Sequence, residues 1–292
     1  MSMLARPALP SPRAALQTLL TGERDGVAPW IRALGDPGDP GWFGPGSTIW
    51  RVHADAASLV GGIRALLVQA MHPTVLAGFD QHSAYREDPT GRLQATAAFV
   101  TVATFGTSEQ ARAACDRVRG VHRRVRGTTD AGVPYDAADP DLLGWVHVAL
   151  VDSLADSVRR FGRTAFDLDV YLAESAVIGD YLKAANVPRS ATQMEATYAH
   201  YLPALAVTEK TFAAHRFILD PPLPPLMRPA YRVLAAAAVA SLPPRLAGFV
   251  AGRPVLPPAP AAAVGRAATR MLSVMLGPSP AASAAARRTR AS

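Results

Sequence analysis

The chain has 292 residues, a formal net charge of +7 and a hydrophobic content of 49%. Its length permits one large domain or two. Alanine and leucine dominate where a β protein would carry valine, isoleucine and threonine, which favours an all-α core. The one cysteine, Cys115, excludes an intrachain disulfide framework, a Cys-x-x-Cys zinc site and the covalent attachment of a c-type haem.

The charge pattern and the apolar runs exclude several kinds of partner. No apolar run reaches the roughly 18–20 residues that span a bilayer. Prolines interrupt the start of the chain, where a secretory signal needs an unbroken apolar core, so we expect a cytoplasmic protein. The arginines near the C-terminus lack the interleaved aromatic residues or the motif of a nucleic-acid site, so we expect no nucleic acid. They leave a weak contact with anionic lipid open.

Glycine and proline divide the chain into three segments. Residues 1–46 are expected to form an N-terminal arm with short helices, and the loop over residues 35–47 ends at Ser47, a good N-cap. Residues 47–250 carry the main helical domain. Residues 251–292 form an extension rich in Pro, Ala and Arg, and we expect its last sixteen or so residues to be unstructured.

Helical periodicity recurs along the chain and predicts one multi-helix, all-α domain. Asp139 followed by proline indicates a helix start, and a loop of turn-forming residues precedes it. The predicted helices cover residues 14–20, 28–34, 49–70, 75–79, 91–106, 108–127, 140–161, 167–185, a stretch from about 190, 230–242 and 261–276.

Two of these helices, over residues 91–106 and 108–127, carry polar residues on faces that we expect to be buried. Arg92 and Thr96 share one face of the first helix at the spacing i, i+4. In the second helix, His122 falls inside an apolar stripe. From spacing alone, Thr96 is expected to donate a hydrogen bond to the carbonyl of Arg92.

His122 has several interpretations at this stage. Three roles are consistent with its position: a core histidine with a hydrogen-bond partner, an axial ligand of haem iron, and a zinc ligand. Zinc is disfavoured because no second histidine or carboxylate follows three or four residues later, whereas the porphyrin of a haem supplies four ligands itself. Cys115, on the same face, is an alternative thiolate ligand, although a buried apolar role is simpler. No Glu-x-x-His pair of a di-iron site and no Gly-x-Ser-x-Gly motif of a serine hydrolase occurs.

Three segments carry a family resemblance: RALLVQAMHPTVLAGFDQHSAYREDPTGRLQAT (residues 64–96), FGTSEQARAACDRVRGVHRRVRGTT (105–129) and YDAADPDLLGWVHVALVDS (135–153). The order of their motifs resembles that of the MpaB-type oxygenase and latex-clearing-protein (rubber oxygenase) catalytic domain family. The resemblance extends over about residues 63–203. It implies an all-α fold around a buried, non-covalent haem b.

The resemblance also implies roles for residues. In the rubber oxygenases a helix carries an R-x-x-K-T pattern on the distal side of the haem, and a histidine about thirty residues later is the proximal iron ligand. Here Arg92 and Thr96 keep the Arg and the Thr, and His122 follows 26 residues after Thr96. Ala95 stands where the family has lysine, which argues against rubber cleavage and leaves the sixth iron position open, or to water, His72 or His82.

The function expected from the resemblance is a haem-dependent oxygenase or oxidase that uses dioxygen or peroxide on a small, hydrophobic, intracellular substrate. The alternative is a helical haem or ligand binder without turnover, such as a sensor or carrier. The apolar stripes predict a pocket between residues 99–103 (Phe99, Val100, Ala103) and the helix over Leu143–Leu150. The expected catalytic residues are Arg92 and Thr96, the metal ligand is His122, and the cofactor-binding residues are His122, Arg92, Thr96, Arg126 and His147.

Overall fold

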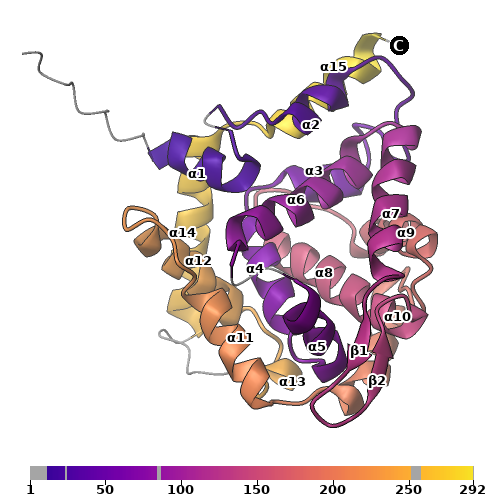
Figure 1. The fold of residues 1–292 in the computed structure, drawn as a ribbon. Coiled ribbons are helices and arrows are strands. Elements are labelled where there is room, and N and C mark those ends of the chain that lie inside the picture. Colours follow the sequence, from indigo (N-terminus) through magenta and orange to yellow (C-terminus); the bar gives the residue numbers. More distant parts are fainter. Residues whose placement is uncertain (1–11, 24, 84–86, 251–257, 292) are drawn as a thin grey trace, which may run out of the picture.

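A computed structural model describes residues 12–23, 25–83, 87–250 and 258–291, in which helices surround a central core (Figure 1). The all-α prediction is confirmed. The helices are α1 Pro12–Thr21, α2 Pro29–Arg32, η1 Ala33–Gly35, α3 Thr48–Ala54, α4 Ser58–Gln69, α5 Pro73–His82, α6 Pro89–Phe105, α7 Ser108–His122, α8 Pro140–Phe161, α9 Leu168–Leu182, α10 Ala191–Tyr201, η2 Leu202–Ala204, α11 Glu209–Leu219, α12 Arg228–Ala240, α13 Pro244–Ala247, α14 Pro258–Leu276 and α15 Pro280–Ala291. The strands β1 Arg126–Thr128 and β2 Pro134–Asp136 pair antiparallel.

Helices α4 and α8 pack against each other at the centre of the molecule (Figure 1). On α8, Trp145, Val148 and Val151 recur every three residues and are buried, as one face of an amphipathic helix requires. Gly61 of α4 allows the close approach, because a Cβ atom there would lie 2.9 Å from the Cα of Leu154. Burial of each large apolar side chain in this contact contributes about 1.5–3 kcal/mol.

Local caps determine where the helices of the site begin. Ser47 accepts a hydrogen bond from the backbone of α3, and Asp139 caps α8 with a proline at the first helical position, as predicted. At α7, Thr107 and Gln110 form a capping box in which each side chain accepts from the other residue's backbone N–H. These caps set the register of α7 and α8, and therefore which of their side chains face α6.

The predicted helix over residues 49–70 is in fact divided into α3 and α4. Asp55 lies at the break, and its carboxylate accepts hydrogen bonds from the backbone N of Ala57 (2.9 Å) and from the hydroxyl of Thr164 (2.9 Å). An aspartate that binds local backbone competes with the helix, and a partner 109 residues away secures the turn. Apolar periodicity continues through this break, so periodicity alone did not reveal it.

Two further elements differ from the predictions. Helix α7 ends at His122 rather than at residue 127, and the segment that follows, expected to be a loop, contains the hairpin β1–β2. Helix α11 lies in a stretch where no helix was predicted. The ring of His215 on α11 is fully buried and its Nε2 lies 2.9 Å from the carbonyl oxygen of Leu67 in α4, which anchors this helix to the core.

The expectation of an unstructured C-terminus is wrong. Helix α15 covers Pro280–Ala291, and Ala281, Ala284, Ala285 and Arg288 form its buried stripe. Alanine has the highest helix propensity, and its small side chain permits close packing, so an alanine-rich composition does not imply disorder here. Helices α2, α8 and α15 come from the three predicted segments and contribute to one hydrophobic core. The division of the chain into three segments stays a prediction. Two parts of these predicted segments lie outside the described residues: residues 1–11 of the N-terminal arm and residues 251–257 at the start of the extension.

The apolar helices α4 and α5 are core elements. Leu67 of α4 is fully buried and Leu76 of α5 is nearly so. Among the described residues, no single helix combines the length and the hydropathy of a membrane span. The pair α4 and α5 reaches them only together, with a bend of 105° between the two helices.

Candidate functional site

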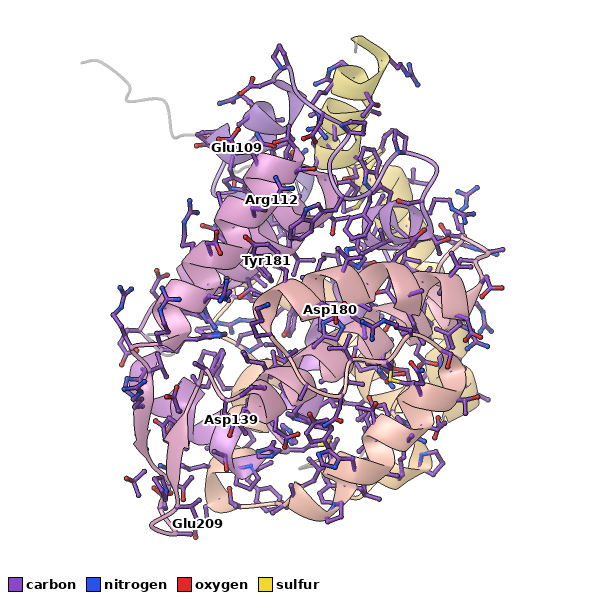
Figure 2. The ribbon with its side chains drawn as sticks, turned by 90° about the vertical axis from the view of Figure 1, so that its right-hand side faces the viewer. Glu109, Arg112, Asp139, Asp180, Tyr181 and Glu209 are labelled. Carbon is purple, nitrogen blue, oxygen red and sulfur yellow. The ribbon has the colours of Figure 1, made fainter. Side chains whose placement is uncertain are left out.

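The candidate site lies on α6 and α7, which are joined by a short turn and pack side by side (Figure 1). Helix α9 supports α7 from the other side. Tyr181 of α9 lies beside α7 (Figure 2). Its hydroxyl donates a hydrogen bond to Asp116 of α7 (3.2 Å), and its ring centre lies 5.2 Å from that of Trp42. These contacts position the helix that ends at His122.

The expected burial of Arg92 and Thr96 is wrong, because both side chains are exposed. On α6 only the last turn, residues 103–105, is buried. The first four turns of this helix are half-buried or exposed although they are rich in alanine and in larger apolar residues such as Leu93, which is 37% exposed. The sequence therefore predicted a buried face at Arg92 and Thr96, whereas neighbouring helices cover α6 along only part of its length.

The charge of Arg92 acts on His122 although 30 residues separate the two in the chain. Burial lowers the pKa of His122, and the positive charge of Arg92 lowers this pKa further, so the imidazole is neutral at pH 7. Burial also lowers the pKa of Arg92, although more than a third of its surface is accessible. The lowered pKa and the accessible surface are compatible, because protein atoms surround the guanidinium of Arg92 while solvent still reaches it. Arginine remains charged under these conditions.

The two side chains lack the partners that such groups normally have. The Nδ1 atom of His122 is buried without a hydrogen-bond partner, which costs about 1–3 kcal/mol for a polar atom in protein. The guanidinium carbon of Arg92 lies 4.8 Å from the centre of the Phe79 ring, and no carboxylate among the described residues pairs with it. Among the described residues, His122 therefore offers a nitrogen without a partner, and Arg92 offers a cation without a carboxylate partner.

Thr96 lies one helical turn after Arg92. Its hydroxyl donates a hydrogen bond to the carbonyl of Arg92 (3.0 Å), so the predicted local bond is confirmed. The hydroxyl oxygen keeps a free lone pair toward solvent. Ala95, at the position where the resemblance leads us to expect the family's lysine, is exposed beside it.

A cavity of about 30 Å³ lies between α3, α6, α8 and α9. Phe99, Val100, Ala103 and Leu150 are among its walls, as the apolar stripes predicted. This volume has room for one or two water-sized molecules. It is therefore an internal cavity beside α6 and not a site for an organic substrate.

His147 lines the same cavity from α8. Its side chain is 7% exposed, its Nε2 atom has no hydrogen-bond partner, and burial lowers its pKa to about 4. Gly179 of α9 makes room for the ring, since a Cβ atom there would lie 3.0 Å from the Cε1 of His147. The structure thus brings His147 together with α6 but places it in the cavity, apart from the pair of Arg92 and His122.

Another histidine, the half-buried His53, was not among the predicted site residues. The Thr104 hydroxyl donates to the carbonyl of Val100 (2.8 Å), so its oxygen accepts a hydrogen bond from Nδ1–H of His53 (2.8 Å). The Nε2 atom of His53 then accepts from the Tyr171 hydroxyl (3.2 Å), which fixes the tautomer and links α9, α3 and α6. The spacing from Ile49, i+4 on α3, places His53 on the buried face and was the available sequence signal.

The remaining candidates lie elsewhere. Arg126 is 68% exposed on β1 and pairs with Asp136 of β2 (2.8 Å), so the structure does not bring it to His122. The Nε2 atom of His82 lies 3.0 Å from the carbonyl of Arg126, and His72 is buried near Trp145 with an unpartnered Nδ1.

Cys115 is fully buried on α7, and burial raises the pKa of its thiol to about 12. A thiol with this pKa is protonated at neutral pH and is a poor metal ligand. The simpler interpretation of Cys115, a small apolar residue of the core, fits this environment. Among the described residues, no three His, Cys, Asp or Glu side chains are grouped as a metal ion would need.

The family described as ER-bound oxygenase mpaB/B'/Rubber oxygenase, catalytic domain, matches residues 50–274. The chain belongs to this family. The match confirms the resemblance and extends it from the first turns of α3 to the end of α14, so it includes α6, α7 and the cavity. Neither a curated protein nor a solved structure matches the chain.

Rubber oxygenases of this family use haem iron, and the side chains present here are of the types that bind a haem. His122 offers a neutral imidazole with an unpartnered nitrogen, and Arg92 offers a cation without a carboxylate, as a haem propionate would need. The cavity beside His147 is too small for a haem. The residues that fit are therefore those of the partly covered side of α6 and α7.

Proposed function

We propose that this protein is a haem b-dependent oxygenase of a small, hydrophobic substrate, with dioxygen or peroxide as its second substrate. Membership of the oxygenase family supports the reaction class. The observation that carries the proposal is the buried Nδ1 of His122, which has no partner and lies within reach of the charge of Arg92, a cation that no carboxylate among the described residues pairs with. A porphyrin brings four of its own iron ligands, so one imidazole suffices.

His122 would hold the haem iron, and Arg92 would bind a propionate or place its positive charge beside the oxidant. A haem in this site supplies the redox chemistry with dioxygen that protein side chains lack. Desolvation keeps the imidazole unprotonated at pH 7, so His122 is ready to bind without losing a proton. Thr96, one turn from Arg92, presents a hydroxyl whose proton is already donated to the helix backbone, so its oxygen acts as an acceptor.

The apolar character of the substrate is supported by apolar side chains exposed on the two helices of the site. Leu93 of α6 is 37% exposed, and Val121 of α7 is 45% exposed. Exposed apolar side chains around a few directed polar groups are typical of sites for apolar ligands. Ala95 leaves an additional small, apolar position beside Thr96, where a rubber oxygenase carries a lysine.

The first test is the absorption spectrum of the protein expressed with haem supplied. We expect a Soret band in the wild type, its loss or displacement in His122→Ala, and no change in His200→Ala, a matched exposed histidine on α10. A wild-type protein that takes up no haem would refute the proposal. An unchanged spectrum of His122→Ala would refute the role of His122.

The second test separates an oxygenase from a sensor or carrier. We expect the haem-loaded protein to consume dioxygen or peroxide when small apolar alkenes are added, and Arg92→Met to reduce the rate about tenfold or more, the usual effect of losing a charge-assisted hydrogen bond. A stable haem complex that consumes neither oxidant with any alkene would favour the non-catalytic binder.

A further inference from the structure

The charges of this chain are distributed unevenly between its two parts. Residues 221–292 contain nine arginines and no Asp, Glu or Lys, whereas the first 220 residues carry a net charge of −2. An excess of one sign at one end of a sequence indicates an electrostatic partner of the opposite sign. The excess itself does not identify the surface, because several of these arginines already have partners.

Several of these arginines already contact other parts of the chain. Arg232 pairs with Asp220 and Arg245 with Glu195, Arg228 donates to the carbonyl of Leu223, and Arg288 is buried against backbone carbonyls. Arg266 and Arg270 of α14 are exposed, and no ion pair within the described part of the chain engages either of them. These two arginines are one helical turn apart, so they share one face of α14.

Helix α14 also exposes a stripe of apolar side chains. Val264 is 41% exposed, Met271 is 56% exposed and Val274 is 79% exposed, and their spacing of seven and three residues places them on one side of the helix. Arg266 and Arg270 follow one edge of this stripe. We call these five residues the α14 face. Large apolar side chains at such exposure, together with cations, need a partner that accepts both.

The opposite side of α14 is firmly packed, so the α14 face is presented in a fixed orientation. Leu272 is buried, and the Thr269 hydroxyl donates a hydrogen bond to the carbonyl of Phe161 at the end of α8 (2.7 Å). A Cβ atom at Gly265 would lie 2.9 Å from the Phe161 ring, so this glycine allows α14 to approach α8 closely. In Figure 1, α14 lies on the side of the molecule away from α7.

We propose that the α14 face docks on an anionic lipid surface. A helix with an exposed apolar stripe, arginines along its edge and no acidic residue matches the interfacial helices that lie in the plane of a membrane. The arginines would contact lipid phosphates, and Met271 and Val274 would enter the boundary of the acyl chains. The tail beyond α14 contributes less than its composition indicates, since α15 packs into the core.

The test measures partitioning of the full chain into vesicles of equal parts phosphatidylglycerol and phosphatidylcholine, with pure phosphatidylcholine vesicles as the lipid control. An arginine near an anionic surface strengthens binding about fivefold, so Arg266→Gln/Arg270→Gln should weaken partitioning about 25-fold. Met271→Ser/Val274→Ser should weaken it about tenfold. Added salt should weaken wild-type binding, because it screens surface charge.

A matched variant is Arg112→Gln/Arg117→Gln, which removes the same charge from exposed positions on α7 and should leave partitioning nearly unchanged. All three variants alter exposed side chains, and equal thermal unfolding temperatures would show that they fold. Absence of wild-type binding to the anionic vesicles overturns the proposal. Equal loss in the α14 and α7 variants, or equal binding to pure phosphatidylcholine, also overturns it. A dimer in sedimentation that Met271→Ser/Val274→Ser dissociates would instead assign the face to a second copy of the chain.

Discussion

Arg288 joins the C-terminal helix to the end of α6, so its replacement tests the packing of α15. Its side chain is 2% exposed, and its guanidinium donates to the carbonyls of Leu34, Pro40 (3.4 Å) and Phe105 (2.9 Å). Phe105 is the last residue of α6. The charge of one buried arginine thus satisfies carbonyls from three separate segments, which the Arg288→Ala variant would leave without their donor.

The magnitude follows from these bonds. A hydrogen bond from a charged donor contributes about 1.5–3 kcal/mol, and the bond to Pro40 is long, so we expect Arg288→Ala to lower the free energy of unfolding by about 3 kcal/mol. For a chain of this size the unfolding temperature would fall by about 6 °C or more. Arg287, the next residue, is exposed, and Arg287→Ala should change stability by less than about 0.5 kcal/mol.

The assay is urea unfolding of both variants at pH 7, followed by far-ultraviolet circular dichroism. The two variants remove the same charge from the same helix, so a difference between them reports the buried contacts. Equal stability of Arg288→Ala and Arg287→Ala would refute the packing of α15 described above and would support an unstructured C-terminus.

Two other predictions concern the core. Gly61→Ala should destabilise the protein by about 1–3 kcal/mol, because the added Cβ would meet the backbone of α8. In Gly62→Ala the added Cβ meets nothing within 4 Å, so this variant should be neutral or stabilising. Equal thermal unfolding temperatures of the two variants would contradict the close contact of α4 and α8. Burial lowers the pKa of His147 and of His53 from 6.5 to about 4, so the unfolded chain binds protons that the folded chain does not, and stability present above pH 6.5 should fall by up to about 3 kcal/mol per histidine as the pH falls to 4. Urea unfolding across this range should show a shallower pH dependence for His147→Leu, and an unchanged slope would contradict the burial of a neutral ring.

The features that sequence predicted well depend on neighbouring residues. The caps at Ser47 and Asp139 need only a short side chain next to the first helical turn. The cavity wall at Phe99 and Leu150 was predictable because apolar side chains at helical spacing line one face. His122 was selected as a candidate ligand by its position in such a stripe and by the order of the family's motifs, and its role stays a prediction.

The features that sequence missed depend on distant partners. Asp55 divides a periodic helix by binding Thr164, and His53 gains its role from Tyr171, so neither effect is visible in local spacing. Arg92 is exposed because neighbouring helices cover only part of α6, and the periodicity of a sequence does not show which helices pack against it. Helix α15 was missed because its alanines resemble low complexity, whereas Arg288 gives it a specific buried contact.

The most direct test of the account is chemical rescue of the proposed iron ligand. In His122→Gly expressed with haem, we expect the Soret band of the wild type to be lost or displaced and to return when free imidazole is added, since imidazole can occupy the space of the missing ring. His200→Gly, which removes an exposed histidine on α10, should keep the wild-type spectrum without imidazole. A wild-type spectrum of His122→Gly in the absence of imidazole would contradict the assignment of His122 as the haem ligand.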